Sequence, residues 1–173
     1  QDITARQRGT VIHLLLEGLA GLEVAHYETT AREFLTHYPD LEAEHNQIIA
    51  EVMKLLAKPD LQMLFGPQSR AEVPIGGRLL MPGGDNQLFS GRIDRYVDLP
   101  EAILIADYKT TRHPPSADDP IDADIAIQLE IYRKLVSAAY LGKEVRCAIV
   151  WTAGPQYRLV TPEELDEAWQ KLK

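Results

Sequence analysis

Residues 88–112 read LFSGRIDRYVDLPEAILIADYKTTR, and this stretch most constrains what the chain can fold into. Two apolar segments, 88–98 and 102–109, are separated by the tight turn sequence DLPEA, a pattern that predicts two adjacent strands. They carry Asp94 and Asp107, although aspartate is rare in strands and a half-buried carboxylate is costly unless it is paired. Either the outer face of a hairpin is simply charged, or a divalent metal ion lies between the carboxylates.

Side chains alternate between the two faces of a strand, and this rule places the charges. Asp107 and Lys109 share one face, at the end where the apolar run stops. A tight turn would bring Asp94 alongside Asp107. Two carboxylates near a backbone carbonyl form the oxygen-rich site that Mg²⁺ or Mn²⁺ prefers. The Asp-x-Lys pattern alone is more often a solvated ion pair, so other residues must decide.

The sequence before this strand pair predicts three helices and a short strand. Apolar residues at helical spacing predict helices at 8–21, 27–38 and 40–58, the last with Asp40 as its N-cap. Residues 70–75 are predicted to form a strand, and the Gly-Gly pair and PGGDN predict turns on either side of RLLM.

Three further elements are expected after the strand pair and a polar loop: a helix at about 122–141, a strand at 144–152 and a helix at 161–172. The last helix begins with a capping-box pattern from Thr161 to Glu164. This order of elements predicts an α/β (α+β) fold, in which helices flank a mixed central sheet that contains an antiparallel meander.

Length and composition fit one domain over residues 1–173. Apolar residues make up 45% and charged residues 25%, which is ordinary for a globular protein and argues against disorder. We expect a helical part at about 8–58, a sheet-containing core at about 70–152 and the C-terminal helix. The chain begins with Gln1, which we interpret as the start of a fragment of a larger protein.

The chain shows no signal peptide and no apolar run long enough to cross a membrane, which predicts a cytoplasmic protein. Cys147 is the only cysteine, so an intramolecular disulfide and a multi-cysteine zinc or iron–sulfur site are excluded. We expect it to be buried in a strand. The net charge of −8 argues against a general nucleic-acid binder, unless a partner grips the nucleic acid.

Four more polar residues accompany the carboxylates. His13 lies among apolar residues of the first predicted helix, where a buried structural histidine is the commoner interpretation. Glu72 lies in the short strand, where it could be an exposed edge charge. Gln128 and Tyr132 are four residues apart in the long helix and therefore share a face. A buried tyrosine bonded to a glutamine is as good an explanation as a functional pair.

Taken in order, these residues resemble the PD-(D/E)XK nuclease superfamily and its RecB-like group. The matching motifs are His13 in GTVIHLLLE, Glu72 in AEVPI, Asp94 in SGRIDR, Asp107 and Lys109 in DYKT, and Gln128 with Tyr132 in QLEIY. Each motif alone is weak, whereas the ordered set over residues 8–152 is specific. The resemblance implies a restriction-endonuclease-like core and metal-dependent cleavage of DNA.

The resemblance also implies roles for these residues. Mg²⁺, or Mn²⁺ in its place, would be held by His13, Asp94, Asp107 and the Tyr108 carbonyl oxygen. Lys109 would orient or activate the attacking water, Glu72 could bind a second metal or polarise water, and Gln128 and Tyr132 would position the DNA strand or brace the metal ligands. Arg92, Arg95 and Arg112 are candidate phosphate contacts, although solvated surface arginines are commoner.

Within the group, the chain looks most like the C-terminal nuclease domain of an AddA-type helicase–nuclease, which processes double-strand breaks in bacteria. That resemblance implies a helicase domain in the same parent chain, a second nuclease-bearing subunit of AddB type, and single-stranded DNA as the main substrate. Some relatives carry an iron–sulfur cluster on four cysteines, which this sequence lacks. The alternatives are a catalytically silent DNA-binding or scaffolding module and a stand-alone defence or restriction nuclease.

Overall fold

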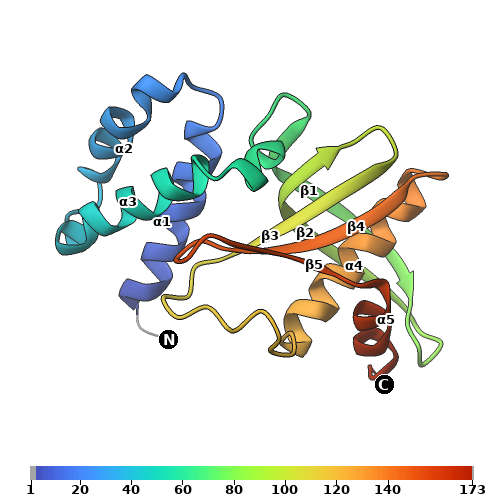
Figure 1. Cartoon of the computed structure of the whole chain (residues 1–173). Coiled ribbons are helices and arrows are strands. Elements are labelled where there is room, and N and C mark those ends of the chain that lie inside the picture. The colour runs from blue at the N-terminus through green and yellow to red at the C-terminus, as the bar shows by residue number, and fades with distance from the viewer. Residues whose placement is uncertain (1–2, 173) are drawn as a thin grey trace.

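A five-stranded mixed sheet organises the chain (Figure 1), and its mixed character agrees with the order of the predicted elements. This computed structural model describes residues 3–172. The strands lie in chain order: β1 (Ser69–Leu80), β2 (Asn86–Asp98), β3 (Ala102–Lys109), β4 (Glu144–Trp151) and β5 (Gln156–Val160). All neighbours are antiparallel except β3 and β4, which are parallel and are joined by helix α4 (Ala123–Ala139). A parallel pair needs such a crossover, because a tight turn can only reverse the chain.

The predicted turn at Gly76 and Gly77 is wrong, because β1 runs straight through both glycines. They pair with Ser90 and Phe89 of β2. A Cβ atom added at Gly77 would lie 2.8 Å from Leu135 of α4, so the glycine lets the helix pack closely on the strand. The second predicted turn is confirmed, since Met81 N–H donates to the Asp85 carbonyl oxygen at 2.8 Å.

Sequence reasoning missed β5 altogether. This strand is short, lies at the sheet edge and is only partly buried, so it lacks the apolar run that identified its neighbours. The capping box after it is confirmed: Thr161 Oγ1 accepts from Glu164 N–H, and a Glu164 side-chain oxygen accepts from Thr161 N–H at 2.9 Å. Helix α5 (Pro162–Gln170) follows.

The N-terminal part is helical as predicted, but most of the helix boundaries differ. The helices are α1 (Ile3–Leu19), α2 (Tyr27–Leu35) and α3 (His45–Leu56), with the short 3-10 helices η1 (Val24–His26), η2 (Pro39–Glu44) and η3 (Pro59–Leu64) between and after them. Asp40 is therefore not the N-cap of one long helix, because it lies inside η2. Helix α1 begins earlier than predicted, at Ile3, because its first turns carry polar residues that gave no apolar pattern.

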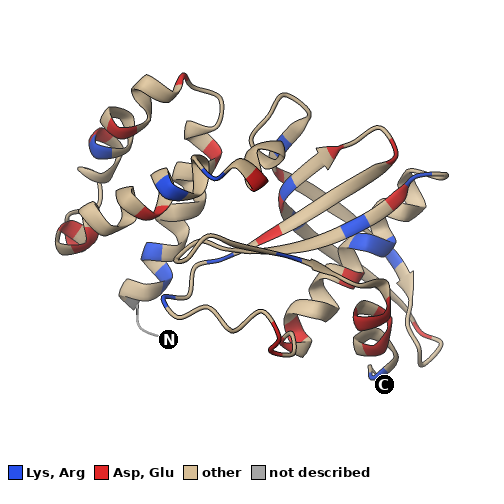
Figure 2. Ribbon diagram, in the orientation of Figure 1, with Lys and Arg blue, Asp and Glu red and all other residues tan. Residues whose placement is uncertain are grey.

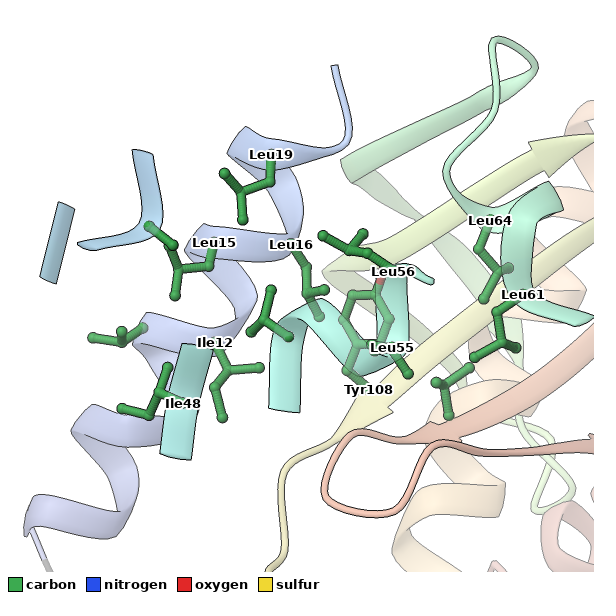
Figure 3. Close-up of a cluster of buried hydrophobic side chains, with 14 of the residues drawn as sticks. Ile12, Leu15, Leu16, Leu19, Ile48, Leu55, Leu56, Leu61, Leu64 and Tyr108 are labelled. Carbon is green, nitrogen blue, oxygen red and sulfur yellow. The ribbon is translucent and has the colours of Figure 1, made fainter. Parts of the chain in front are cut away.

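The larger core lies between one face of the sheet and the N-terminal helices (Figure 3). Ile12 and Leu16 of α1 and Leu55 of α3 are fully buried there, and Tyr108 of β3 points into the same cluster. Burying one such aliphatic side chain stabilises the fold by about 1.5–3 kcal/mol. These contacts fix α1 against β3, which matters because α1 carries His13.

Helices α4 and α5 cover the opposite face of the sheet, where a second core contains Ile103 and Ile105 of β3 and Leu129 of α4. Cys147 of β4 lies in this core with 1% of its surface exposed, as predicted. Burial raises the pKa of its thiol to about 12, so the side chain stays protonated and apolar at neutral pH. Within residues 3–172, none of the helices combines the length and apolarity that a membrane span requires.

Candidate active site

The site forms where β2 separates from β3. Backbone pairing between them ends at Arg95 and Ala106. The next residue, Asp94, accepts a hydrogen bond from Tyr108 N–H through Oδ2 at 2.7 Å, so its carboxylate takes the place of a backbone carbonyl. The side chain of Asp94 therefore fills the gap between the strands, beside the segment that contains Asp107.

Glu72 approaches the same gap through an unusual backbone. It has a φ of 51° and is the one non-glycine residue within 3–172 with a positive φ. Pairing between β1 and β2 skips it, since Ala71 pairs with Arg95 and Val73 with Ile93. A non-glycine residue in this region costs about 1–3 kcal/mol, and such strain tends to occur at functional sites.

His13 of α1 completes a group with these two carboxylates. Its Nδ1 atom lies 3.4 Å from Asp94 Oδ1 and 3.9 Å from Glu72 Oε1. One potential ligand atom from each of the three residues lies within 4.8 Å of the others. The imidazole also meets the Tyr108 ring edge-on, with centroids 5.4 Å apart. Helix packing and aromatic contact together hold the ring toward the carboxylates.

Asp107 and Lys109 lie on β3 beside this group. Lys109 Nζ is 2.7 Å from Asp107 Oδ2. The contact lacks hydrogen-bond geometry, and this buried oxygen has no hydrogen-bond partner among residues 3–172. A buried carboxylate oxygen that has an ion-pair partner but no hydrogen bond is only partly compensated, so it is a candidate ligand for a bound cation.

The site contains more carboxylates than basic groups: Glu72, Asp94 and Asp107 lie beside Lys109 and His13. Burial and the nearby Asp94 raise the pKa of Asp107, and burial and Asp94 also raise the pKa of Glu72. Burial by itself lowers the pKa of His13, but the bond to Asp94 and the surrounding carboxylates outweigh it, so that pKa is raised. Carboxylates that destabilise one another in this way fit a bound cation, which would remove their repulsion.

A solvent-open cleft of about 900 Å³ leads to the site. His13, Glu72 and Lys109 reach its wall, whereas Asp94 and Asp107 lie behind them. The remaining wall is mixed: it contains the basic residues Arg6, Arg92 and Arg158, the acidic residues Glu17, Asp119 and Asp122, and the apolar side chains of Ile121, Ile125 and Trp151.

The family model of the PD-(D/E)XK nuclease superfamily matches residues 1–172, which is nearly the whole chain. The chain belongs to the PD-(D/E)XK nuclease superfamily. The mixed sheet with flanking helices agrees with the restriction-endonuclease-like fold. A search of curated proteins finds no match. Among solved structures, one described as "Crystal structure of SSO0001" is similar, with 14% identity and a TM-score of 0.40 over 92% of this chain and 82% of that one.

In this PD-(D/E)XK domain, Gln128 and Tyr132 form a pair beneath β2. Gln128 Nε2 donates to the Tyr132 hydroxyl at 3.1 Å, and Tyr132 is 8% exposed. A Cβ atom built on Gly91 would lie only 2.5 Å from that hydroxyl. The tyrosine therefore rests on the bare backbone of β2, three residues before Asp94. This contact supports bracing of the strand rather than direct contact with a ligand.

Replacing Gly91 by alanine is therefore expected to lower the free energy of unfolding by about 1–3 kcal/mol, because the methyl group would displace Tyr132. Urea unfolding would measure the change. Gly21→Ala is the control, since a Cβ atom there meets nothing within 4 Å. Adding Tyr132→Phe to Gly91→Ala should recover part of the loss. Equal effects of the Gly91 and Gly21 variants would contradict the packing argument.

The three arginines predicted as phosphate contacts have different surroundings. Arg95 is 4% exposed and donates to the Leu16 carbonyl oxygen at 2.8 Å and to the Tyr108 hydroxyl at 3.1 Å. Its burial is incompatible with a phosphate contact, so it is a structural residue. Arg92 is exposed at the cleft near Glu72, whereas Arg112 pairs with Glu44 at 2.7 Å.

Sequence reasoning missed two arginines that line the cleft, Arg6 and Arg158. Arg6 could have been found, because it lies two helical turns before His13 and thus on the same face of α1. Arg158 lies on the strand that the sequence did not reveal. It donates to the Asp119 carbonyl oxygen at 2.6 Å and pairs with Glu164, so it fastens the loop at the cleft edge.

Proposed function

We propose that this chain is a magnesium-dependent nuclease that hydrolyses phosphodiester bonds in DNA. The observation that carries the proposal is the convergence of Asp94, Asp107 and Lys109 on adjacent strands, where Lys109 lines the cleft and the buried Asp107 carboxylate lies behind it with one oxygen that makes no hydrogen bond. Superfamily membership supports the reaction class. A solvated ion pair on the face of a hairpin would have neither burial nor a second carboxylate beside it.

The donor set fits a hard divalent cation. His13, Glu72 and Asp94 bring their potential ligand atoms together. Asp107 and the Tyr108 carbonyl oxygen, which are not part of that group, would join His13 and Asp94 in holding Mg²⁺, or Mn²⁺ in its place, with Glu72 available as a further ligand. Such an ion, when bound, supplies Lewis-acid stabilisation of phosphate charge and lowers the pKa of a coordinated water. The raised pKa values of Asp107 and Glu72 are the sign expected of carboxylates gathered for a cation.

The protein's own side chains would provide orientation. Lys109 reaches the cleft and can donate to a water or to a phosphate oxygen. Arg92, with 66% of its side chain exposed, can contact a phosphate at the rim. Gln128 and Tyr132 would act by fixing the strand that carries Asp94, and Arg95 by fixing Tyr108.

We propose exonucleolytic action on single strands that a helicase domain of the same parent chain produces during double-strand-break repair in the bacterial cytoplasm, as in AddA-type enzymes with an AddB-type partner. The ordered motifs support it, and so does the net charge of −8, which suits a domain whose DNA is gripped by another part of the assembly.

Incubating the chain with end-labelled single-stranded DNA and Mg²⁺ is expected to give cleavage that EDTA abolishes. Duplex DNA of the same sequence should be cut more slowly, and a circular single strand would reveal cutting without ends. Calorimetric titration with Mn²⁺ provides a second readout that does not need DNA. Absence of both cleavage and metal binding would favour the silent scaffolding module.

A further inference from the structure

We propose that Arg8, Glu51 and Thr152, here called the Arg8 clasp, position the Lys109 segment and set the spacing between α1 and the active-site carboxylates. The proposal rests on the nuclease function above. None of the three residues lines the cleft or belongs to the His13, Glu72 and Asp94 group. They are positioning residues, which act through the backbone that they hold.

Arg8 joins three separate parts of the chain to α1. It is 4% exposed, forms an ion pair with Glu51 of α3, and lies 3.0 Å through Nε from Glu44 at the end of η2. Its Nη1 atom donates to the Thr110 carbonyl oxygen at 3.2 Å. Figure 2 shows basic residues of the first turns of α1 beside the segment that follows β3. The planar guanidinium can serve several acceptors at once, which a lysine cannot.

Thr152 holds the same segment from the other side. Its hydroxyl donates to Glu51 Oε1 at 2.5 Å, and its N–H donates to the Lys109 carbonyl oxygen at 3.0 Å. The two oxygens of Glu51 are thus divided between Arg8 and Thr152. Consecutive carbonyl groups, those of Lys109 and Thr110, are fixed at the point where β3 ends and an irregular loop begins.

The clasp also sets the position of His13. A Cβ atom on Gly9 would lie 2.9 Å from Thr110 Oγ1, so the backbone of α1 comes close to the clasped segment. Gly9 and His13 are four residues apart and share one face of the helix. The contact that places α1 on Thr110 therefore also places His13 against Asp94. Lys109 and His13, which lie on different elements, are located by one buried network.

This network is not a second cation site. Glu44 and Glu51 are close to Arg8, and Arg112 adds a second guanidinium 2.7 Å from Glu44. The two carboxylates already have two positive partners. The charges of this network are paired, although Arg8 Nε and Glu44 Oε2 form no hydrogen bond within residues 3–172. Removing one partner of a buried ion pair is costly, which suits a positioning role.

Thr152→Val is the sharpest test, because valine keeps the size and the backbone N–H but removes the hydroxyl. We expect kcat on single-stranded DNA to fall about tenfold, with KM little changed, as for other residues that orient an active-site group. Thr152→Ser, which keeps the hydroxyl, should restore kcat. Rescue by serine and a kcat change without a KM change are results that general destabilisation would not give.

Arg8→Lys supplies a readout that does not need cleavage. Lysine keeps the positive charge but lacks the planar set of N–H donors with which the guanidinium binds several acceptors, so His13 should be held less firmly. We therefore expect Mn²⁺ affinity, measured by calorimetry, to fall about tenfold. Leu35→Ala is the matched control for stability, because Leu35 is fully buried in α2 and outside the clasp. Urea unfolding identifies the conditions at which the variants are equally folded.

The proposal is overturned if Thr152→Val and Arg8→Lys are destabilised as Leu35→Ala is, yet keep wild-type kcat and wild-type Mn²⁺ affinity. If the wild-type chain binds Mn²⁺ but cuts no DNA, only the nuclease function fails, and the Mn²⁺ affinity of Arg8→Lys decides the clasp. A wild-type chain that neither cuts nor binds Mn²⁺ refutes both, because the clasp would then have no site to position.

Discussion

Asp107→Asn is expected to abolish metal-dependent DNA cleavage and to weaken Mn²⁺ binding to the isolated chain. The amide keeps the shape of the carboxylate but removes the charge that the proposed site needs, and removal of a group essential to the transition state costs about 1,000-fold or more in rate. Burial and Asp94 raise the pKa of Asp107, so the folded protein disfavours its charge. In EDTA the variant should therefore unfold at a temperature no lower than the wild type.

Asp98→Asn is the matched control. Asp98 lies at the far end of β2, is exposed, and pairs with Lys143 at 2.5 Å. The same chemical change there should leave cleavage and Mn²⁺ affinity unaltered. End-labelled DNA on a denaturing gel, calorimetry and a thermal melt in EDTA give the three measurements. Wild-type cleavage by Asp107→Asn would remove Asp107 from the site.

Lys109→Met, in contrast, is expected to separate the two readouts, with cleavage lost and metal binding kept. The methionine fills similar volume without the ammonium group, whose donation to a water or phosphate oxygen is expected to be worth about 100- to 1,000-fold in kcat. Lys109 Nζ is 2.7 Å from Asp107 Oδ2, so its loss leaves the carboxylates more negative. Mn²⁺ affinity should consequently stay the same or rise.

Lys143→Met, the partner of the control above, tests whether loss of any lysine slows the reaction. We expect wild-type rates, because Lys143 pairs with Asp98 away from the cleft. The two ion pairs thus form a matched set, with only one inside the site. Weakened Mn²⁺ binding in Lys109→Met would show that the lysine supports the site structurally, and it would then lose its proposed role toward water and phosphate.

Several features of the fold could be predicted from local pattern. The strands at 88–98 and 102–109 and the long helix after them follow from apolar periodicity, and the start of α5 follows from its capping box. The turn at Gly76 and Gly77 was predicted wrongly, because a glycine pair signals conformational freedom but not how it is used. Here it allows α4 to approach β1.

The candidate site, like the fold, could be predicted only in part from the sequence. Alternation along β3 places Asp107 and Lys109 together, and the short turn places Asp94 near them. Nothing local could show that Glu72 adopts a left-handed backbone or that the pairing between β1 and β2 skips it. That conformation persists because the surrounding strands and α1 hold it, and those contacts come from distant parts of the chain.

The sequence by itself determined the order of the elements and the identity of the chemical groups, since both depend on neighbours within a few residues. Only the tertiary structure decided which charges face the cleft. Arg95 was a plausible phosphate contact, yet it reaches the carbonyl oxygen of Leu16, far away in the chain, and is buried. Arg8 was unremarked, yet it joins α1 to α3 and to the end of β3. A long charged side chain can extend in many directions, and its partner is fixed only when distant segments pack together.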